Sequence, residues 1–168
     1  FHVTGVQTCA LPISNAQSQK GCLILAASKN IGEWKASDVS PLIWYSRKIA
    51  RVVGSTLASE AYALSGSVDL LSWLRIQWSW ICQPSHEWKN PEKCLSTSPE
   101  AYAVVDCKSL YDLVQKTTIP QCQEYRTTLE ALIIKDRMKE GVRIKWVHSA
   151  AQLADSLTKH MEIGRAHV

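Results

Sequence analysis

The hydrophobic positions along the chain change their period several times, and each period predicts one kind of element. Short apolar runs bounded by polar residues occur at residues 21–28 and 39–46, which predicts two paired strands joined by a polar connection. From residue 55 to about residue 82 the apolar side chains recur at helical spacing, which predicts one long amphipathic helix.

The second half of the chain alternates between the two periods. It predicts strands at residues 102–105 and 142–147, and helices at about 108–115, 123–140 and 152–161. Three prolines predict a loop over residues 83–100. In the helix at 123–140 the expected buried stripe consists of Tyr125, Leu129, Leu132 and Ile133. Mixed strands and helices without repeats predict an α/β (mixed α+β) fold, with one mixed sheet and helices on its faces.

Both ends of the chain differ in character from the middle. Residues 3–13, VTGVQTCALPI, back-translate into a common sequencing-library adapter, and residues 162–168, EIGRAHV, back-translate into a sequence whose core is the reverse complement of the same adapter. An insert read between two adapters gives this arrangement. We therefore expect residues 1–14 and 162–168 to be adapter-derived and non-native, and residues 15–161 to be one domain, truncated at its N-terminus.

Charge and cysteine content narrow the class of protein only slightly. The chain carries a net charge of +4, with 19 Lys and Arg against 15 Asp and Glu, and this mild excess is compatible with a phosphate-rich partner. Within residues 15–161 five cysteines are scattered without a C-x-x-C pair, which favours reduced thiols in an intracellular setting. No apolar run is long enough to predict a membrane span.

Three carboxylates lie at positions where a charge needs an explanation. Asp106 ends an apolar run and precedes a helix, so it either caps that helix or serves a site. Glu60 lies beside the apolar stripe of the long helix, where it either reaches water at the edge or meets a partner. Asp155 lies in the first turns of the last helix, where interaction with the helix dipole is the simpler explanation. If the three converge, they need cations, and a metal site follows.

Three segments together carry a resemblance to a known family. STLASEAYALSGSVDLLSWLR, AVVDCKSLYDLV and IKWVHSAAQLADSLTKHM resemble the ribonuclease H domain of Ty1/copia-type retrotransposon polyproteins, and the similarity covers residues 15–161. The resemblance implies a ribonuclease H-like fold. It also implies that Glu60, Asp106 and Asp155 are catalytic metal ligands, the second, third and fourth of four acidic residues.

The family uses the four acids to hold two Mg²⁺ ions, with Mn²⁺ as a possible substitute, and hydrolyses the RNA strand of RNA–DNA hybrids during reverse transcription. In such two-metal sites the ions lie about 3.5–4 Å apart, one activating water and the other stabilising the leaving oxygen. The first acid belongs on the opening strand, which is central in this fold. No aspartate occurs before Asp38, so we expect the first strand to be missing or replaced and the fragment to be inactive.

The resemblance also implies partners and a location. The expected partners are an RNA–DNA hybrid and the reverse transcriptase domain upstream in the same polyprotein, in a cytoplasmic particle or the nucleus. Arg47, Lys48 and Arg51 are candidate phosphate contacts, although a solvated polar loop explains them equally well. His148 precedes the last helix, and its short spacing to Asp155 favours a strand-end residue over a proton shuttle.

Three classes of function remain open at this level. The first is a retroelement ribonuclease H. The second is a catalytically dead domain of the same fold that binds nucleic acid or braces the adjacent reverse transcriptase. The third is an integrase-type nuclease, which the LADSLTK segment disfavours.

Overall fold

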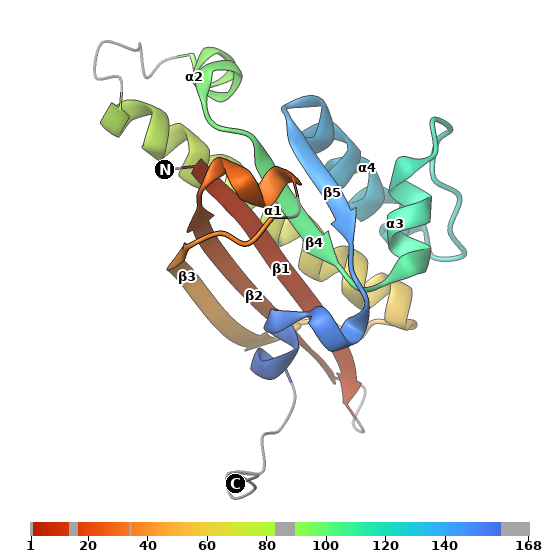
Figure 1. Ribbon diagram of the computed structural model, residues 1–168. Coiled ribbons are helices and arrows are strands. Elements are labelled where there is room, and N and C mark those ends of the chain that lie inside the picture. Colours follow the sequence, from red (N-terminus) through yellow and green to blue (C-terminus); the bar gives the residue numbers. More distant parts are fainter. Residues whose placement is uncertain (1, 14–16, 34, 83–89, 159–168) are drawn as a thin grey trace, which may run out of the picture.

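The sheet is the centre of the molecule and has five strands in the order β3-β2-β1-β4-β5 (Figure 1). The computed structural model describes residues 2–13, 17–33, 35–82 and 90–158. Neighbouring strands are antiparallel from β3 to β1 and parallel from β1 to β5. The strands are β1 (His2–Ile13), β2 (Gln17–Ala27), β3 (Val39–Lys48), β4 (Ala101–Val105) and β5 (Val142–Trp146).

Helices cover the two faces of the sheet unequally. The α-helices are α1 (Thr56–Cys82), α2 (Pro91–Thr97), α3 (Lys108–Gln115) and α4 (Tyr125–Lys139). Short 3-10 helices are η1 (Lys29–Glu33), η2 (Ser149–Ala151) and η3 (Leu153–Leu157). The long helix α1, together with α3 and α4, lies behind the sheet in Figure 1, and η3 crosses its front.

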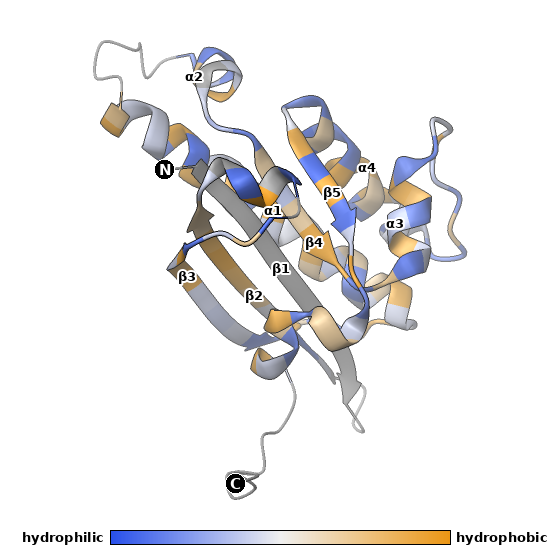
Figure 2. Cartoon of the chain, viewed as in Figure 1, coloured by the Kyte–Doolittle hydropathy of each residue, from blue (hydrophilic) through white to orange (hydrophobic). Residues whose placement is uncertain are grey.

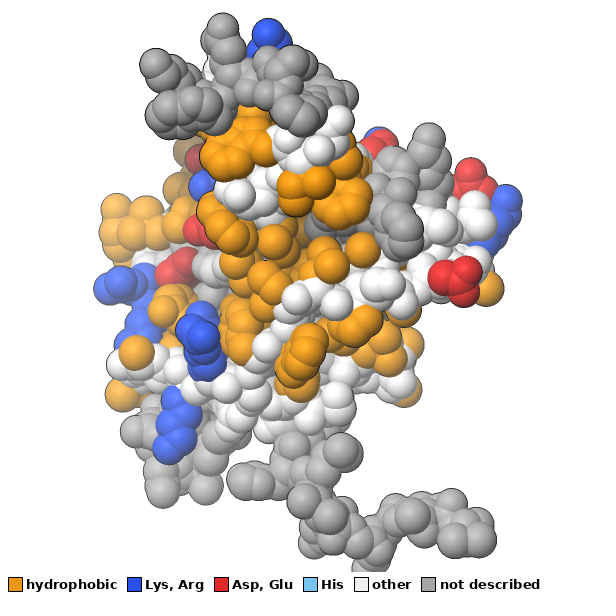
Figure 3. All heavy atoms as spheres, turned by 90° about the vertical axis from the view of Figure 1, so that its left-hand side faces the viewer, with side chains coloured by type: hydrophobic (Ala, Val, Ile, Leu, Met, Phe, Trp, Pro, Cys, Tyr) orange, Lys and Arg blue, Asp and Glu red, His pale blue; other side chains and the backbone are white. Residues whose placement is uncertain are grey.

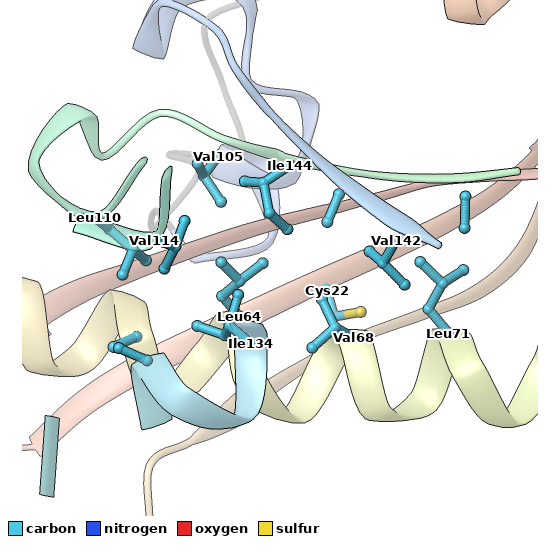
Figure 4. Close-up of a cluster of buried hydrophobic side chains, with 14 of the residues drawn as sticks. Cys22, Leu64, Val68, Leu71, Val105, Leu110, Val114, Ile134, Val142 and Ile144 are labelled. Carbon is cyan, nitrogen blue, oxygen red and sulfur yellow. The ribbon is translucent and has the colours of Figure 1, made fainter. Parts of the chain in front are cut away.

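The main core lies between the sheet and the α1–α4 layer. Leu64, Val68 and Leu71 recur on one side of α1 and are fully buried against side chains of the strands (Figure 4). Val142 and Ile144 of β5 point into the same core. Arg143 and Lys145 alternate with them along the strand, and the colour of β5 alternates accordingly in Figure 2. The alternation of apolar and polar residues therefore specifies which face of β5 is covered.

Strand β1 occupies the central position of the sheet, between β2 and β4. It pairs with β2 along nearly its whole length, with a register shift between Val3 and Val6, and its parallel register with β4 passes through Val6–Ala103 and Gln7–Val104. Residues 2–13 therefore form a paired strand and are not loosely attached, whereas their expected adapter-derived origin stays a prediction. Main-chain hydrogen bonds need no particular side chains, and an empty centre would leave two strand edges unpaired. Residues 162–168, which we expect to be adapter-derived as well, lie outside the described residues.

The prediction of the buried stripe of α4 was wrong. Tyr125, Leu129 and Ile133 are 77%, 41% and 39% exposed, whereas Thr127, Glu130, Ala131 and Ile134 face inward. The rotation of α4 about its own axis is set by a polar pair that turns Glu130 inward. Ser65 of α1 donates a hydrogen bond to Glu130 (Oγ to Oε2, 2.5 Å). Small residues on the inner face let α4 approach α1 closely, and the larger apolar residues stay at the surface.

Two other expectations need correction. The segment expected as a loop at residues 83–100 contains α2, whose first turn is capped by Asn90 accepting a hydrogen bond from the Lys93 amide (3.2 Å). The expected last helix at 152–161 is, in its described part, the 3-10 helix η3 that follows η2. The remaining strands and helices agree with the predicted ones to within a few residues at each end.

Hydrophobic side chains also gather outside the core, over β3 and the C-terminal half of α1 (Figure 3). Trp44 and Trp73 are 63% and 53% exposed, and Val39, Leu42 and Ile81 are exposed as well. No helix among the described residues is long and apolar enough to cross a membrane.

Candidate functional site

The three predicted carboxylates belong to three elements that meet at one end of the sheet. Strand β4 ends there, immediately before Asp106. Because β1 is parallel to β4 and antiparallel to β2, the start of β2 and the end of β3 lie at this same end, and α1 begins just after β3. Helix α1 thus brings Glu60 to this end, on one side of the sheet, and η3 brings Asp155 to it on the other side.

Glu60 lies in the second turn of α1 and is only 4% exposed. The helix is started by Ser55, whose Oγ accepts a hydrogen bond from the Ala58 amide (3.1 Å). Glu60 is flanked on the same face by Leu64, which belongs to the core. A carboxylate at such a position costs free energy unless another group compensates its charge, so its burial is compatible with a cation site.

Asp106 does not cap the helix that follows it. The N-cap of α3 is Cys107, without a side-chain capping bond, and the Asp106 carboxylate makes no hydrogen bond to the cap. Its carbonyl oxygen accepts a hydrogen bond from Trp146 Nε1 (2.9 Å), which fixes the backbone at the end of β4. Oxygen Oδ1 is buried and has no hydrogen-bond partner among the described residues. A buried acceptor without a donor is costly, and a bound cation would satisfy it.

Asp155 is positioned by a close approach of η3 to the sheet. A Cβ atom on Gly21 of β2 would lie 3.0 Å from Leu157 Cβ and 3.1 Å from the Ala154 carbonyl oxygen. On the other side of β1, Gln152 Nε2 donates to the Val104 carbonyl of β4 (3.4 Å). The segment carrying Asp155 therefore crosses β1 between two anchors, and glycine at position 21 is what permits the contact.

The pairing of β1 shows which of its residues lies level with the end of β4. Cys9 pairs with Gly21 of β2, and continuing the parallel register from Gln7–Val104 by two residues sets Cys9 opposite Asp106. Cys9 therefore stands in the row that runs from Gly21 to Asp106, under the crossing η3. Sequence reasoning missed this position because the register of a strand depends on its neighbours as well as on its own sequence.

The carboxylates of Glu60, Asp106 and Asp155 do not form one compact cluster. Among the described residues, no three His, Cys, Asp or Glu side chains lie close enough together to hold a metal ion. The donor set still fits magnesium in kind, because carboxylate oxygens are the ligands of this ion and few protein ligands are needed. The buried Oδ1 of Asp106 is the observation that favours a cation over a purely structural acid.

The candidate phosphate contacts have different environments. Arg47 and Lys48 are exposed at the end of β3. Arg51 is half-buried: its guanidinium lies over the Tyr62 ring (4.6 Å) and pairs with Glu130 (3.3 Å). Arg51 therefore holds α4 against the start of α1, and it is less available to a phosphate than the other two.

His148 and Lys20 complete this end of the sheet. His148 caps η2 as a strand-end residue, its Nδ1 accepting a hydrogen bond from the Ala150 amide (3.3 Å). Lys20 of β2 lies over the rings of Tyr62 (4.8 Å) and Tyr45 (5.9 Å). Burial lowers the pKa of Lys20 below its ordinary value, as expected for an ammonium group taken out of water.

Strand order, the helices on one face and the crossing C-terminal segment together define the ribonuclease H-like fold, as the solved structures confirm. The chain is similar to the N-terminal ribonuclease H domain of a Mycobacterium tuberculosis protein, with a TM-score of 0.62 and 13% identity over 93% of this chain and 91% of that one. It is likewise similar to ribonuclease H1 of the archaeon Halobacterium salinarum NRC-1, with a TM-score of 0.61 and 10% identity over 94% of both chains.

A third similar structure is the foamy viral protease-reverse transcriptase in complex with an RNA/DNA hybrid. The TM-score is 0.51 and the identity 11%, over 92% of this chain and 19% of that one. No family model and no curated protein matches the sequence. At these identities the likeness establishes the fold.

Proposed function

We propose that the chain is a ribonuclease H-type domain of a Ty1/copia-type retrotransposon, which in its intact form hydrolyses the RNA strand of RNA–DNA hybrids. The observation that carries the proposal is the buried oxygen Oδ1 of Asp106, at the end of β4, which has no hydrogen-bond partner among the described residues. The ribonuclease H-like fold supports the same function. So do the three sequence segments that resemble the ribonuclease H domain of Ty1/copia-type retrotransposons. The upstream partner is the reverse transcriptase domain of the same polyprotein.

In this proposal the three carboxylates hold Mg²⁺ together with an aspartate at the position of Cys9. When bound, such ions would supply water activation and charge stabilisation at the leaving oxygen. Glu60 contributes from the helical side of the sheet, Asp155 from the side of η3, and Asp106 from the strand end between them. Arg47 and Lys48, exposed at the adjacent end of β3, bind phosphates of the hybrid.

In this proposal Cys9 stands at the position of the first of the four acids, so we expect the present chain to be inactive. A neutral thiol prefers softer metals and does not replace a carboxylate for Mg²⁺. Losing one ligand also misplaces the attacking water, and a misplacement of about 1 Å can cost roughly 100-fold in rate. This interpretation agrees with an adapter-derived origin of residues 1–14.

The test is to introduce the missing carboxylate. We expect Cys9→Asp to raise Mg²⁺-dependent cleavage of a fluorescent RNA–DNA hybrid by about 100-fold or more over the unaltered chain. Cys9→Asn is the matched control, because it has the size of Asp without the charge, and it should stay inactive. Adding Asp106→Asn to the Cys9→Asp chain should abolish cleavage with little change in the urea midpoint.

Two results would contradict the proposal. One is robust cleavage by the unaltered chain or by the Cys9→Asp, Asp106→Asn double variant. The other is the absence of cleavage by Cys9→Asp and also by a chain whose residues 1–14 are replaced with an aspartate-containing native strand.

A second candidate function is a catalytically dead domain that braces the adjacent reverse transcriptase. The exposed apolar side chains on β3 and on the C-terminal half of α1, Trp44 and Trp73 among them, favour it, because large exposed apolar surfaces often mark interaction sites. Activity of the Cys9→Asp chain separates the two candidates.

A further inference from the structure

The outer side of α4 carries apolar side chains that the described elements leave exposed. The inner side of this helix packs on α1, and α4 also touches α3 and β5. Tyr125, Leu129 and Ile133 are exposed on the opposite side, at intervals of four residues. Residues four apart lie on one face of a helix, so these three side chains form an apolar stripe about 12 Å long.

A hollow lies at the C-terminal end of the same stripe. It has a volume of about 410 Å³ and is lined by residues of the last turns of α4 and its C-cap, which are Ile133, Asp136, Arg137, Lys139 and Glu140. Ile133 belongs to both the stripe and the hollow, so the two are continuous. At the other end of the stripe stands Tyr125, its largest and most exposed side chain. The helix therefore carries a projecting ring at one end and a hollow at the other.

A second copy of α4 running antiparallel to the first would bring each ring to the other copy's hollow. In a two-fold symmetric pair of antiparallel helices, residues equally far from the central residue on opposite sides lie level with each other. If Ala131 is the central residue, Leu129 lies level with Ile133 of the second copy. Tyr125 then lies level with Arg137 of the second copy, which lines the hollow.

The charges along α4 agree with the same antiparallel arrangement. Arg126 is exposed and takes part in none of the ion pairs among the described residues. Asp136 is exposed as well and pairs only with a neighbour on its own helix, Lys139 (2.7 Å). About the centre at Ala131, Arg126 lies level with Asp136 of the second copy, and the symmetry forms this pair twice. A parallel pair of helices would instead place like charges side by side, and it would align the two helix dipoles unfavourably.

We propose that the chain forms a symmetric dimer in which two copies of α4 pack antiparallel. Tyr125 of each copy fills the hollow of the other, the apolar stripes pack together, and Arg126 pairs with Asp136 of the other copy. One helix from each copy makes an interface smaller than about 1,200 Å², the range of weak complexes, so we expect a dissociation constant on the order of 100 μM. The dimer goes beyond the proposed nuclease function and does not depend on it.

The experiment is sedimentation equilibrium of the full chain over concentrations from about 5 to about 500 μM, on both sides of the expected dissociation constant. Arg126→Glu and Asp136→Arg should each weaken dimerisation about tenfold, because each change sets like charges opposite one another twice. An equimolar mixture of the two variants should dimerise again, since both pairs in the mixed dimer have opposite charges. Damage to the fold of either variant would not be repaired by mixing.

Two further comparisons test the ring and the specificity of the charge effect. Tyr125→Ala should weaken dimerisation about tenfold, whereas Tyr125→Phe, which keeps the ring, should stay within about threefold of the unaltered chain. Lys35→Glu is the control for charge reversal, because this lysine is exposed in the connection between β2 and β3 and pairs only with Glu33 (2.6 Å). It should leave the dissociation constant within about twofold, since a distant surface charge is screened.

The proposal is overturned if the unaltered chain stays monomeric at about 500 μM, well above the expected dissociation constant, or if mixing the two charge variants does not restore the dimer. It is also overturned if Trp44→Ser abolishes dimerisation and the α4 variants do not, which would identify β3 as the interface. A monomeric chain that binds a separately produced reverse transcriptase domain, and loses this binding in Tyr125→Ala, would identify that domain as the occupant of α4 and likewise refute the dimer. Failure of the Cys9→Asp chain to cleave would refute the proposed nuclease and leave these association results intact.

Discussion

At the scale of single residues, Cys22 shows how burial alone changes the chemistry of a side chain. It is fully buried in the core under α1, and burial raises the pKa of its thiol above the ordinary value of 9.0, while hydrogen bonds to Ser67 and Tyr45 oppose the shift. The pKa of Tyr45 is raised by burial as well. Such a thiol is a packing residue, not a nucleophile.

The raised pKa of Cys22 predicts a dependence of stability on pH. Its contribution is fully present below pH 9.0, the ordinary pKa, and is lost as pH rises toward the raised pKa of the folded state, because the unfolded chain then loses the proton first. We expect the free energy of unfolding from urea titrations to fall between pH 9 and 10. Lys20, with its lowered pKa, acts in the opposite direction and closer to pH 10.5.

Replacement of the thiol isolates this effect. Cys22→Ala should be less stable at pH 7.5, by about 1–2 kcal/mol for a lost buried sulfur, and should show a shallower decline above pH 9. Cys82→Ala, at an exposed position, serves as the control and should keep the slope of the unaltered chain. An equal slope in both variants would rule out Cys22 as the source.

At the scale of elements, the crossing of η3 over β2 depends on one absent side chain. Gly21→Ala would bring a Cβ to 3.0 Å from Leu157 Cβ and Thr158 Cγ2, too close for ordinary packing. We expect a loss of about 1–3 kcal/mol in the free energy of unfolding. In the Cys9→Asp chain it should also lower cleavage, because Asp155 moves with η3.

Gly66→Ala is the control for Gly21→Ala. Gly66 lies inside α1, and its added Cβ would make only an ordinary contact, 3.7 Å from Lys20 Nζ. Alanine in a helix is favoured over glycine by about 0.5–1 kcal/mol, so this variant should be more stable. If both variants shift the urea midpoint in the same direction, the close approach at Gly21 is not what limits the packing of η3.

The two long helices show where hydrophobic periodicity predicted the buried face correctly and where it did not. Helix α1 agrees with its prediction because many apolar residues repeat on the side that packs on the sheet. In α4 the inner face was mistaken, because Glu130 is drawn inward by Ser65 and Arg51, residues more than sixty positions away. Local pattern carries no information about such partners.

At the scale of the whole molecule, β1 joins the two halves of the sheet. It lies between β2 and β4, so that the hairpin strands and the parallel strands form one surface. If residues 1–14 are adapter-derived, a sequence not selected for this role fills the centre of the fold. Its bulge between Val3 and Val6 is the visible irregularity.

Hydrogen exchange tests the quality of this strand. We expect the amides of residues 3–11 to exchange faster than those of residues 102–105, because a strand of adapter-derived sequence would have no hydrophobic pattern selected to fix its register in the sheet. Residues 102–105 also serve as the internal control, since they belong to the adjacent strand. Equal protection would show a well-formed native strand and refute the adapter-derived origin.

The sequence by itself determined the types of nearly all elements, the mixed α+β class and the three carboxylates as candidates. It could do so because periodicity and the positions of charges on apolar faces are local properties of the chain. Only the tertiary structure decided that β1 fills the centre of the sheet, that Cys9 pairs with Gly21, and that Glu130 faces inward. These features depend on pairing between distant segments, where backbone hydrogen bonds and buried charges select partners that no local pattern specifies.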